Sequence, residues 1–244
     1  LQHTTGRGSS DRSGLAAAGG TRESNKFNYA GADYQVTKDL MVQYYYANLE
    51  DYYQQHFAGL MHVLPLGDFG SLKTDLRYFN SSDDGKNGNT AAYYTSGNYN
   101  GFASGKGKVD NNLYSGLFLY TVAGHTFGGG YQVSNGSSDF PWLNQGDGSS
   151  AYLTTDMQIQ KFARAGERTW QARYSYDFAK VGVPGLTAGA VYLRGDNIDT
   201  YNSKNVQTSN GSSEWERDIT VAYVIQEGTL KNLGFMWKNA MWRN

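Results

Sequence analysis

The stretch Ser71–Phe79 alternates apolar and charged side chains. Two sets of alternate positions are found, one apolar and one charged: Leu72, Leu76 and Tyr78, and Lys73, Asp75 and Arg77. Because successive side chains of a strand point to opposite faces, this stretch predicts a strand with one oily face and one ionic face. In a soluble sandwich the ionic face would meet bulk water. If such strands close into a barrel, the oily faces meet lipid and the ionic faces meet water inside.

Composition leaves the membrane alternative open and excludes several other classes. The 244 residues include 15% aromatic residues and 31 Gly but only 3 Pro, and an all-β unit of this size can be one domain. No run of 18 apolar residues occurs, which excludes helical membrane spans but not strands. A net charge of −1 leaves no electrostatic footprint for nucleic acid. The absence of Cys excludes disulfides and thiolate metal sites.

The alternation recurs in strands of membrane-spanning length. Segment 27–36 and a return strand from residue 40 form a hairpin around Thr37–Asp39. Ten residues rise about 33 Å, and a tilt of about 40° projects this to about 25 Å, the height of an outer-membrane apolar band. Segment 170–178 is the strongest case, with aromatic outward positions and polar inward ones: Trp170, Ala172, Tyr174, Tyr176 and Phe178 outward, and Gln171, Arg173 and Asp177 inward.

The pattern predicts about eleven strands, with residues 1–26 as a loop and long loops at about 80–111, 135–151 and 195–213. The strands are expected at 27–36, from 40, and at 53–64, 71–79, 112–122, 125–134, 152–163, 170–178, 186–194, 215–226 and 232–243. A short strand around 91–99 is an alternative. If loops 80–111 and 195–213 leave from the same rim, an even number of strands must separate them, yet five are drawn. One strand or one loop side is therefore wrong, and 80–111 is the first suspect.

The ends of the sequence also bear on the domain. The chain starts at Leu1 without a signal sequence and stops directly after a strand, at Met241–Asn244. An open strand edge in lipid leaves backbone groups unsatisfied, so a closed barrel needs further strands. We expect residues 1–244 to be a single β-barrel domain that is incomplete, with an upstream portion and a terminal strand absent.

Several stretches together resemble the OprD-type family of substrate-selective outer-membrane porins. The likeness runs from about residue 25 to the end, and the stretches that carry it are Tyr29–Tyr34, Ser71–Phe79, Gly107–Asn111, Gly166–Tyr174, Gly182–Thr187 and Gly195–Asp199. The resemblance implies an eighteen-stranded barrel, inward-folded loops that narrow the pore, and passage of small carboxylate-bearing nutrients. It also implies a row of lumenal Arg and Lys that guides the carboxylate. This chain would then be the later part of such a barrel.

Pattern and resemblance together select the residues of the proposed path. Lys73, Arg77 and Arg173 lie on inward faces within matching stretches, and Lys238 is a weaker candidate because its strand has mixed faces. Asp75 and Asp177 are expected to keep the basic field from trapping a permeant. The alternative for each basic residue is a cross-strand ion pair that only stabilises the wall.

Other chemistry finds little support. The histidines His3, His56, His62 and His125 are scattered, so a zinc site is not expected. Asp83–Asp84 and Asp196–Asp199 could bind calcium, but neither matches a full EF-hand loop. No Gly-x-Ser-x-Gly motif occurs. We therefore expect no catalytic residue, no metal and no cofactor, and a protein that is not an enzyme.

The sequence thus predicts an all-β, antiparallel transmembrane β-barrel in the bacterial outer membrane that passes small carboxylate-bearing solutes by selective diffusion. Its partners would be outer-membrane lipid and those solutes, without nucleic acid, and the assembly would be a monomer or a loose trimer. An outer-membrane barrel hydrolase and a secreted glycan-binding or adhesive β-protein are the alternatives.

Overall fold

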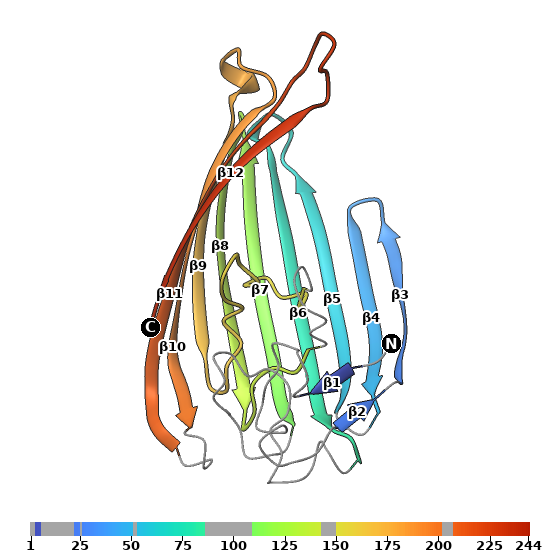
Figure 1. Cartoon of the computed structure of the whole chain (residues 1–244). Coiled ribbons are helices and arrows are strands. Elements are labelled where there is room, and N and C mark those ends of the chain that lie inside the picture. Colours follow the sequence, from blue (N-terminus) through green and yellow to red (C-terminus); the bar gives the residue numbers. More distant parts are fainter. Residues whose placement is uncertain are drawn as a thin grey trace.

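The computed structural model describes residues 3–5, 22–24, 26–50, 53–85, 109–142, 150–201 and 207–244. Within these ranges ten antiparallel strands form one curved sheet, in which each strand pairs with its neighbours in sequence (Figure 1). The strands are β3 (Phe27–Thr37), β4 (Leu40–Leu49), β5 (Tyr53–Pro65), β6 (Ser71–Asp83), β7 (Asp110–Val122), β8 (His125–Gly136), β9 (Arg168–Asp177), β10 (Leu186–Tyr201), β11 (Gln207–Val224) and β12 (Gly234–Arg243).

Short connections join the strands at one end of the sheet. They include two 3₁₀ turns, η1 (Gly67–Phe69) and η2 (Phe178–Val181), after β5 and β9. Because β3 and β12 lie at the two edges and do not pair with each other, the sheet of the described residues is open. No helix in the described ranges is long and apolar enough to span a membrane.

The predicted alternation is confirmed where it is clearest. On β6, Leu76 and Tyr78 are 41% and 44% exposed, whereas Asp75, which precedes Leu76 and points to the opposite face, is 6% exposed. On β9, Trp170 and Tyr174 are exposed, and Gln171 on the opposite face is buried. We call the face that carries Asp75 and Gln171 the inner face, and the opposite face the outer face.

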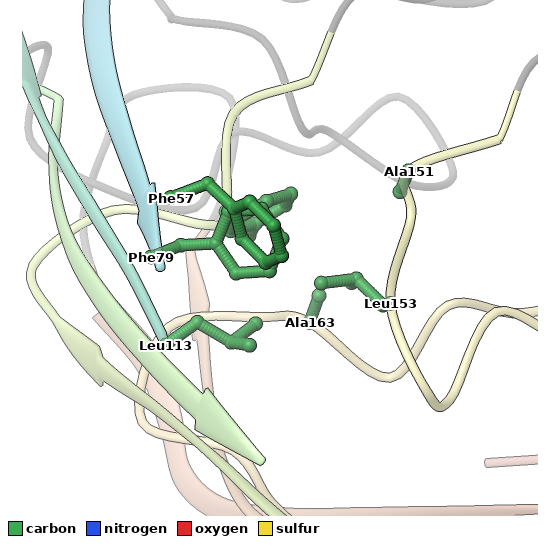
Figure 2. Packing of buried hydrophobic residues seen from close by; sticks show 7 residues of the cluster. Phe57, Phe79, Leu113, Ala151, Leu153 and Ala163 are labelled. Atoms are coloured by element: carbon green, nitrogen blue, oxygen red, sulfur yellow. The ribbon is translucent and has the colours of Figure 1, made fainter. Parts of the chain in front are cut away.

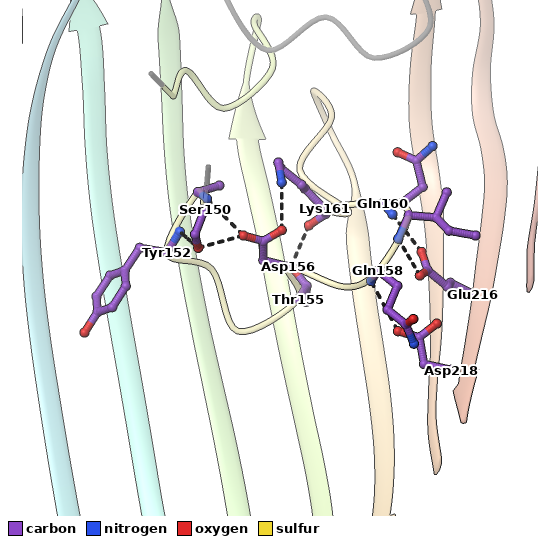
Figure 3. Close-up of polar contacts among 11 residues, drawn as sticks. Ser150, Tyr152, Thr155, Asp156, Gln158, Gln160, Lys161, Glu216 and Asp218 are labelled. Carbon is purple, nitrogen blue, oxygen red and sulfur yellow. Dashed lines mark hydrogen bonds and ion pairs between the residues drawn. The ribbon is translucent and has the colours of Figure 1, made fainter. Parts of the chain in front are cut away.

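The predicted strand at 152–163 is wrong. Residues 150–167 form a chain of turns, here called the inner loop, that follows β8 and lies against the inner face (Figures 1 and 3). Tyr152 and Phe162 adopt positive φ angles of 57° and 53°, which a strand does not tolerate. Of its alternate apolar residues, Leu153 is buried by packing on the sheet and not by a ladder partner, whereas Ile159 is 48% exposed.

Removing that strand resolves the strand count. Four strands, β7 to β10, now separate the connections after β6 and after β10, so both leave from the same rim as parity requires. The expected loop at 135–151 therefore extends to residue 167. The expected loop at 195–213 is much shorter, because β10 reaches Tyr201 and β11 starts at Gln207.

Two further expectations concern the first 26 residues and the 80–111 loop. Residues 1–26 were expected to be loop, but β1 (His3–Thr5) and β2 (Arg22–Ser24) pair as a two-stranded sheet. The alternative strand at 91–99 and the centre of the 80–111 loop lie outside the described residues.

A small apolar cluster seats the inner loop on the sheet. Phe57, Phe79 and Leu113 come from the inner faces of β5, β6 and β7, and the buried Leu153 and Ala163 of the inner loop pack on them (Figure 2). The rings of Phe57 and Phe79 have centroids 4.6 Å apart. Burial of each large side chain contributes about 1.5–3 kcal/mol, so this cluster is a substantial part of loop docking.

Candidate functional site

Arg77 connects β6 to the inner loop. Its Nε and Nη2 donate to the two carboxylate oxygens of Asp75 at 2.8 and 2.7 Å. Its Nη1 donates to the backbone carbonyl of Tyr152 at 2.8 Å, and the guanidinium carbon lies 4.3 Å from the centroid of the Tyr152 ring. The Asp75 pairing is the wall-stabilising alternative, but it runs along one strand and not across two, and the same arginine also holds the loop.

Arg173 makes the equivalent connection from β9. Its Nε donates to Gln171 at 2.7 Å, and its Nη2 donates to the backbone carbonyl of Thr154. The two arginines therefore bind carbonyls two residues apart in the inner loop. Guanidinium groups suit this role because their donors have a fixed planar geometry.

Space for Arg173 is provided by Gly128 on β8. A Cβ atom at Gly128 would lie 2.9 Å from Cβ of Arg173 and 2.7 Å from Cδ2 of Leu119. Such contacts are too close, so a side chain here would displace Arg173. Gly128 thus allows the neighbouring Arg173 side chain to approach the strand closely.

Substituting Gly128 by Val should displace Arg173 from the Thr154 carbonyl and destabilise the protein by about 1–3 kcal/mol, since it overpacks the inner face. Urea unfolding of the protein in lipid vesicles would measure this. Gly129→Val is the matched control, because a Cβ at Gly129, on the outer face, meets no atom within 4 Å. Equal destabilisation by both variants would contradict the assigned role of Gly128.

Carboxylates of β11 hold the other side of the inner loop. Glu216 accepts hydrogen bonds from the backbone N–H groups of Ile159 and Gln160 at 2.9 and 2.8 Å, and Asp218 accepts from Gln158 at 3.2 Å (Figure 3). Both carboxylates are buried. The loop thus presents carbonyls to the arginines of β6 and β9 and N–H groups to the acids of β11.

Asp156 organises the loop between these two anchors. Its Oδ2 accepts from Ser150 Oγ at 2.8 Å and from the Ala151 backbone N–H at 2.9 Å. Its Oδ1 accepts from Lys161 Nζ at 2.7 Å (Figure 3). One carboxylate therefore joins the beginning of the loop to residue 161, which fixes the shape that the walls then bind.

Two acidic side chains lie close together at the end of the inner loop next to β9: Glu167 of the loop and Glu214 of β11. Arg164 Nη2 lies 3.6 Å from Glu214 Oε2, which also accepts from Trp242 Nε1 at 2.7 Å. Glu167 accepts from the Arg164 backbone N–H at 3.0 Å. Burial raises the pKa of the Glu167 carboxyl well above its usual range, and the neighbouring Glu214 raises it further.

The other predicted path residues are placed as follows. Lys73 is exposed on the inner face, and its row of paired residues runs through Leu119 and Gly128 to Arg173. Lys238 is exposed on the inner face of edge strand β12, opposite Thr220. Asp177 lies at the short-connection end of β9, where its Oδ1 accepts from Ala179 N–H at 2.9 Å and caps η2.

Sequence reasoning missed the residues that hold the inner loop. Glu216 and Asp218 occupy alternate positions of β11, a signal that could have placed both on the inner face. Asp156 and Thr154 gave no such signal, because the segment was interpreted as a strand. Within the described ranges no group of three or more His, Cys, Asp or Glu residues could hold a metal ion.

Comparison with models of known families identifies the chain. The model described as outer membrane porin, OprD family, matches residues 1–244. The chain belongs to the OprD family. This confirms the resemblance found in the sequence and places the chain among outer-membrane porins.

Individual OprD-family relatives are similar over most of this chain but only part of their own. This chain is 33% identical over 221 residues to the porin-like protein GalP of Pseudomonas putida, and the match covers 90% of this chain and 46% of GalP. Porin D of Pseudomonas aeruginosa is 30% identical over 239 residues, covering 93% of this chain and 50% of Porin D.

Solved porins confirm the fold class. The crystal structure of Pseudomonas aeruginosa OccK8 (OprE) matches with a TM-score of 0.82 and 60% identity over 91% of this chain and 55% of that chain. That of Pseudomonas aeruginosa OpdQ matches with a TM-score of 0.76 and 41% identity over 91% and 53%. The chain spans about half the length of the relatives it matches.

Proposed function

We propose that this OprD-family chain forms part of the wall of a passive outer-membrane channel that passes small carboxylate-bearing solutes. The carrying observation is the placement of Lys73, Arg77 and Arg173 on the inner face, two of them bound to the inner loop. The names of the relatives are those of porins and not of enzymes, which supports transport over the hydrolase alternative. The similarity to solved porins likewise favours it over a secreted binding protein.

The domain in this proposal is a single barrel, of which the described part of the chain supplies ten strands. The open edges at β3 and β12 need partners, because unpaired backbone groups are costly in lipid. Further strands of the same polypeptide would close the barrel. The inner loop would then lie in the pore and narrow it.

The basic row suits transit better than storage of a solute. Lys73 and Arg173 are three strands apart on one row, which is about 14 Å at the usual strand spacing. A carboxylate can pass between such groups by exchanging contacts. An ion pair at the exposed Lys73 contributes only about 0.2–1 kcal/mol, so this step does not trap the solute.

Bilayer recordings on the full-length polypeptide that contains this chain would test the proposal. We expect Arg173→Gln and Lys73→Gln each to lower the permeability of benzoate relative to sodium by about 1.5- to 5-fold, the factor that about 0.2–1 kcal/mol produces. Arg194→Gln is the control, because this substitution removes the same charge from the outer face. Arg194 is paired there with Asp196 at 3.1 Å. Absence of conductance, or equal effects of all three variants, would overturn the proposal.

A further inference from the structure

A pocket of about 380 Å³ opens on the inner face beside the inner loop. It lies between β3, β4, β5 and β6 on one side and the ring of Tyr152 on the other. Its volume falls in the range of small-ligand sites. Lys73, Arg77 and Arg173 do not line it, although Arg77 lies against the Tyr152 ring that forms one of its walls.

Four of the eight described residues that line the pocket are aromatic: Tyr45, Phe57, Phe79 and Tyr152. The Phe57 ring is central, with the Tyr45 ring 6.3 Å away and the Phe79 ring 4.6 Å away. The Tyr152 ring meets Phe57 edge-on at 5.5 Å and 80°. Figure 3 shows the Tyr152 side chain pointing away from the Asp156 network, which leaves its ring free to complete this wall.

Tyr152 is held in this position from its other face. The Arg77 guanidinium lies over the Tyr152 ring at 4.3 Å, and Arg77 also binds the Tyr152 carbonyl. The positive φ of Tyr152, 57°, is uncommon for a residue with a large side chain, and such conformations persist where the surroundings impose them. The ring is thus a fixed partition between the guanidinium and the pocket.

Among the described residues that line the pocket, Asp33 is the only charged one. Its Oδ1 accepts from Gln43 Nε2 at 2.8 Å and from Tyr45 Oη at 3.1 Å. Neither bond uses Oδ2, and no ion pair with a described Lys, Arg or His neutralises the carboxylate. The two donors orient Asp33 and leave one carboxylate oxygen for a ligand.

A glycine allows the Tyr45 ring to lie along the wall. A Cβ atom at Gly31, opposite Tyr45 in the β3–β4 ladder, would be 2.4 Å from Cδ1 of that ring. Any other residue at this position would move the ring. The position of the Tyr45 ring is therefore set by the local sequence, without a bound ligand.

We propose that this pocket binds a substituted ammonium group. Positive charge is attracted to aromatic faces, and aromatic walls are a recurring means of binding alkylated ammonium ions. The Asp33 carboxylate adds a charge partner for the same group, whereas a carboxylate would be repelled by Asp33. The inference rests on the proposed function in one respect, since it takes the inner face to line the water path.

Choline is a suitable probe, with 3,3-dimethyl-1-butanol as its uncharged analogue. In bilayer recordings on the full-length polypeptide, choline should reduce single-channel current and the analogue should not. Asp33→Asn, which keeps the shape but removes the charge, should weaken the choline effect about tenfold, as loss of a charge-assisted contact does. Tyr45→Leu should weaken it independently by removing one ring.

Asp196→Asn is the matched control. It also neutralises one carboxylate, but Asp196 pairs with Arg194 and lies away from the pocket. Binding of choline to the detergent-solubilised protein, measured by calorimetry, gives a readout that does not depend on current. If the channel conducts and responds to Arg173→Gln but Asp33→Asn leaves choline binding unchanged, the pocket inference is wrong and the proposed function stands. If no current is seen but choline binds and Asp33→Asn abolishes binding, the proposed function fails and the pocket inference survives.

Discussion

Replacing Glu216 and Asp218 together by Ala should detach the inner loop from β11 and increase single-channel conductance. The double substitution removes three hydrogen bonds between buried carboxylates and the backbone N–H groups of residues 158–160. A hydrogen bond to a charged group contributes about 1.5–3 kcal/mol, and the sum is reduced because desolvating two neighbouring carboxylates has its own cost. We expect loop docking to weaken by about 2–4 kcal/mol.

Two measurements would check this expectation. Conductance reports the width of the pore, and limited proteolysis reports the exposure of the loop backbone. The double variant Glu216→Gln and Asp218→Asn is the matched control. Each amide keeps one acceptor oxygen, so the Asp218 bond and one of the two Glu216 bonds can remain, and docking should weaken less than in the Ala variant. If the Ala variant showed unchanged conductance and unchanged protection of residues 150–167, the β11 carboxylates would not be needed to hold the loop, and its apolar cluster and the two arginines would suffice.

The second large effect is expected on the outer face. Leu76→Arg should destabilise the folded protein in a bilayer by about 2–4 kcal/mol, the cost of a charge on the lipid side of a barrel near its midplane. Leu76 is 41% exposed on the outer face of the central part of β6. Equilibrium unfolding by urea in lipid vesicles would give the free energy.

The control places the same charge at the same exposure on the other face. Val63 is 40% exposed, on the inner face of β5 opposite Lys73. Val63→Arg should lower the free energy of unfolding by about 0.2–1 kcal/mol at most, the effect of two like charges on adjacent strands. If Leu76→Arg and Val63→Arg destabilised the protein equally, the assignment of the outer face to lipid would be wrong.

Loop and walls are complementary in a way that no single strand reveals. The inner loop turns its carbonyls towards Arg77 and Arg173, and its N–H groups towards Glu216 and Asp218. An irregular backbone buried in a pore has no ladder to satisfy these groups, so charged side chains of the walls take that role. The same arginines therefore have two duties, loop support and, as proposed, solute guidance.

Local sequence pattern determined the two faces of the strands and the family. Alternation in 71–79 and 170–178 is enough to separate Leu76 from Arg77 and Tyr174 from Arg173, because the period of a strand is two residues. The same rule placed Lys73 on the inner face, whereas the mixed faces of the last strand left Lys238 less certain from sequence; in the structure both side chains lie on that face.

Tertiary structure alone decided what happens to residues 152–163. Their alternating pattern is compatible with a strand, but whether Leu153 packs on lipid, in a ladder or on Phe57 and Phe79 depends on residues up to about a hundred positions away. The same holds for Arg77, whose carbonyl partner is 75 residues distant. Periodicity describes which side chains share a face, and it carries no information about which distant backbone that face will contact.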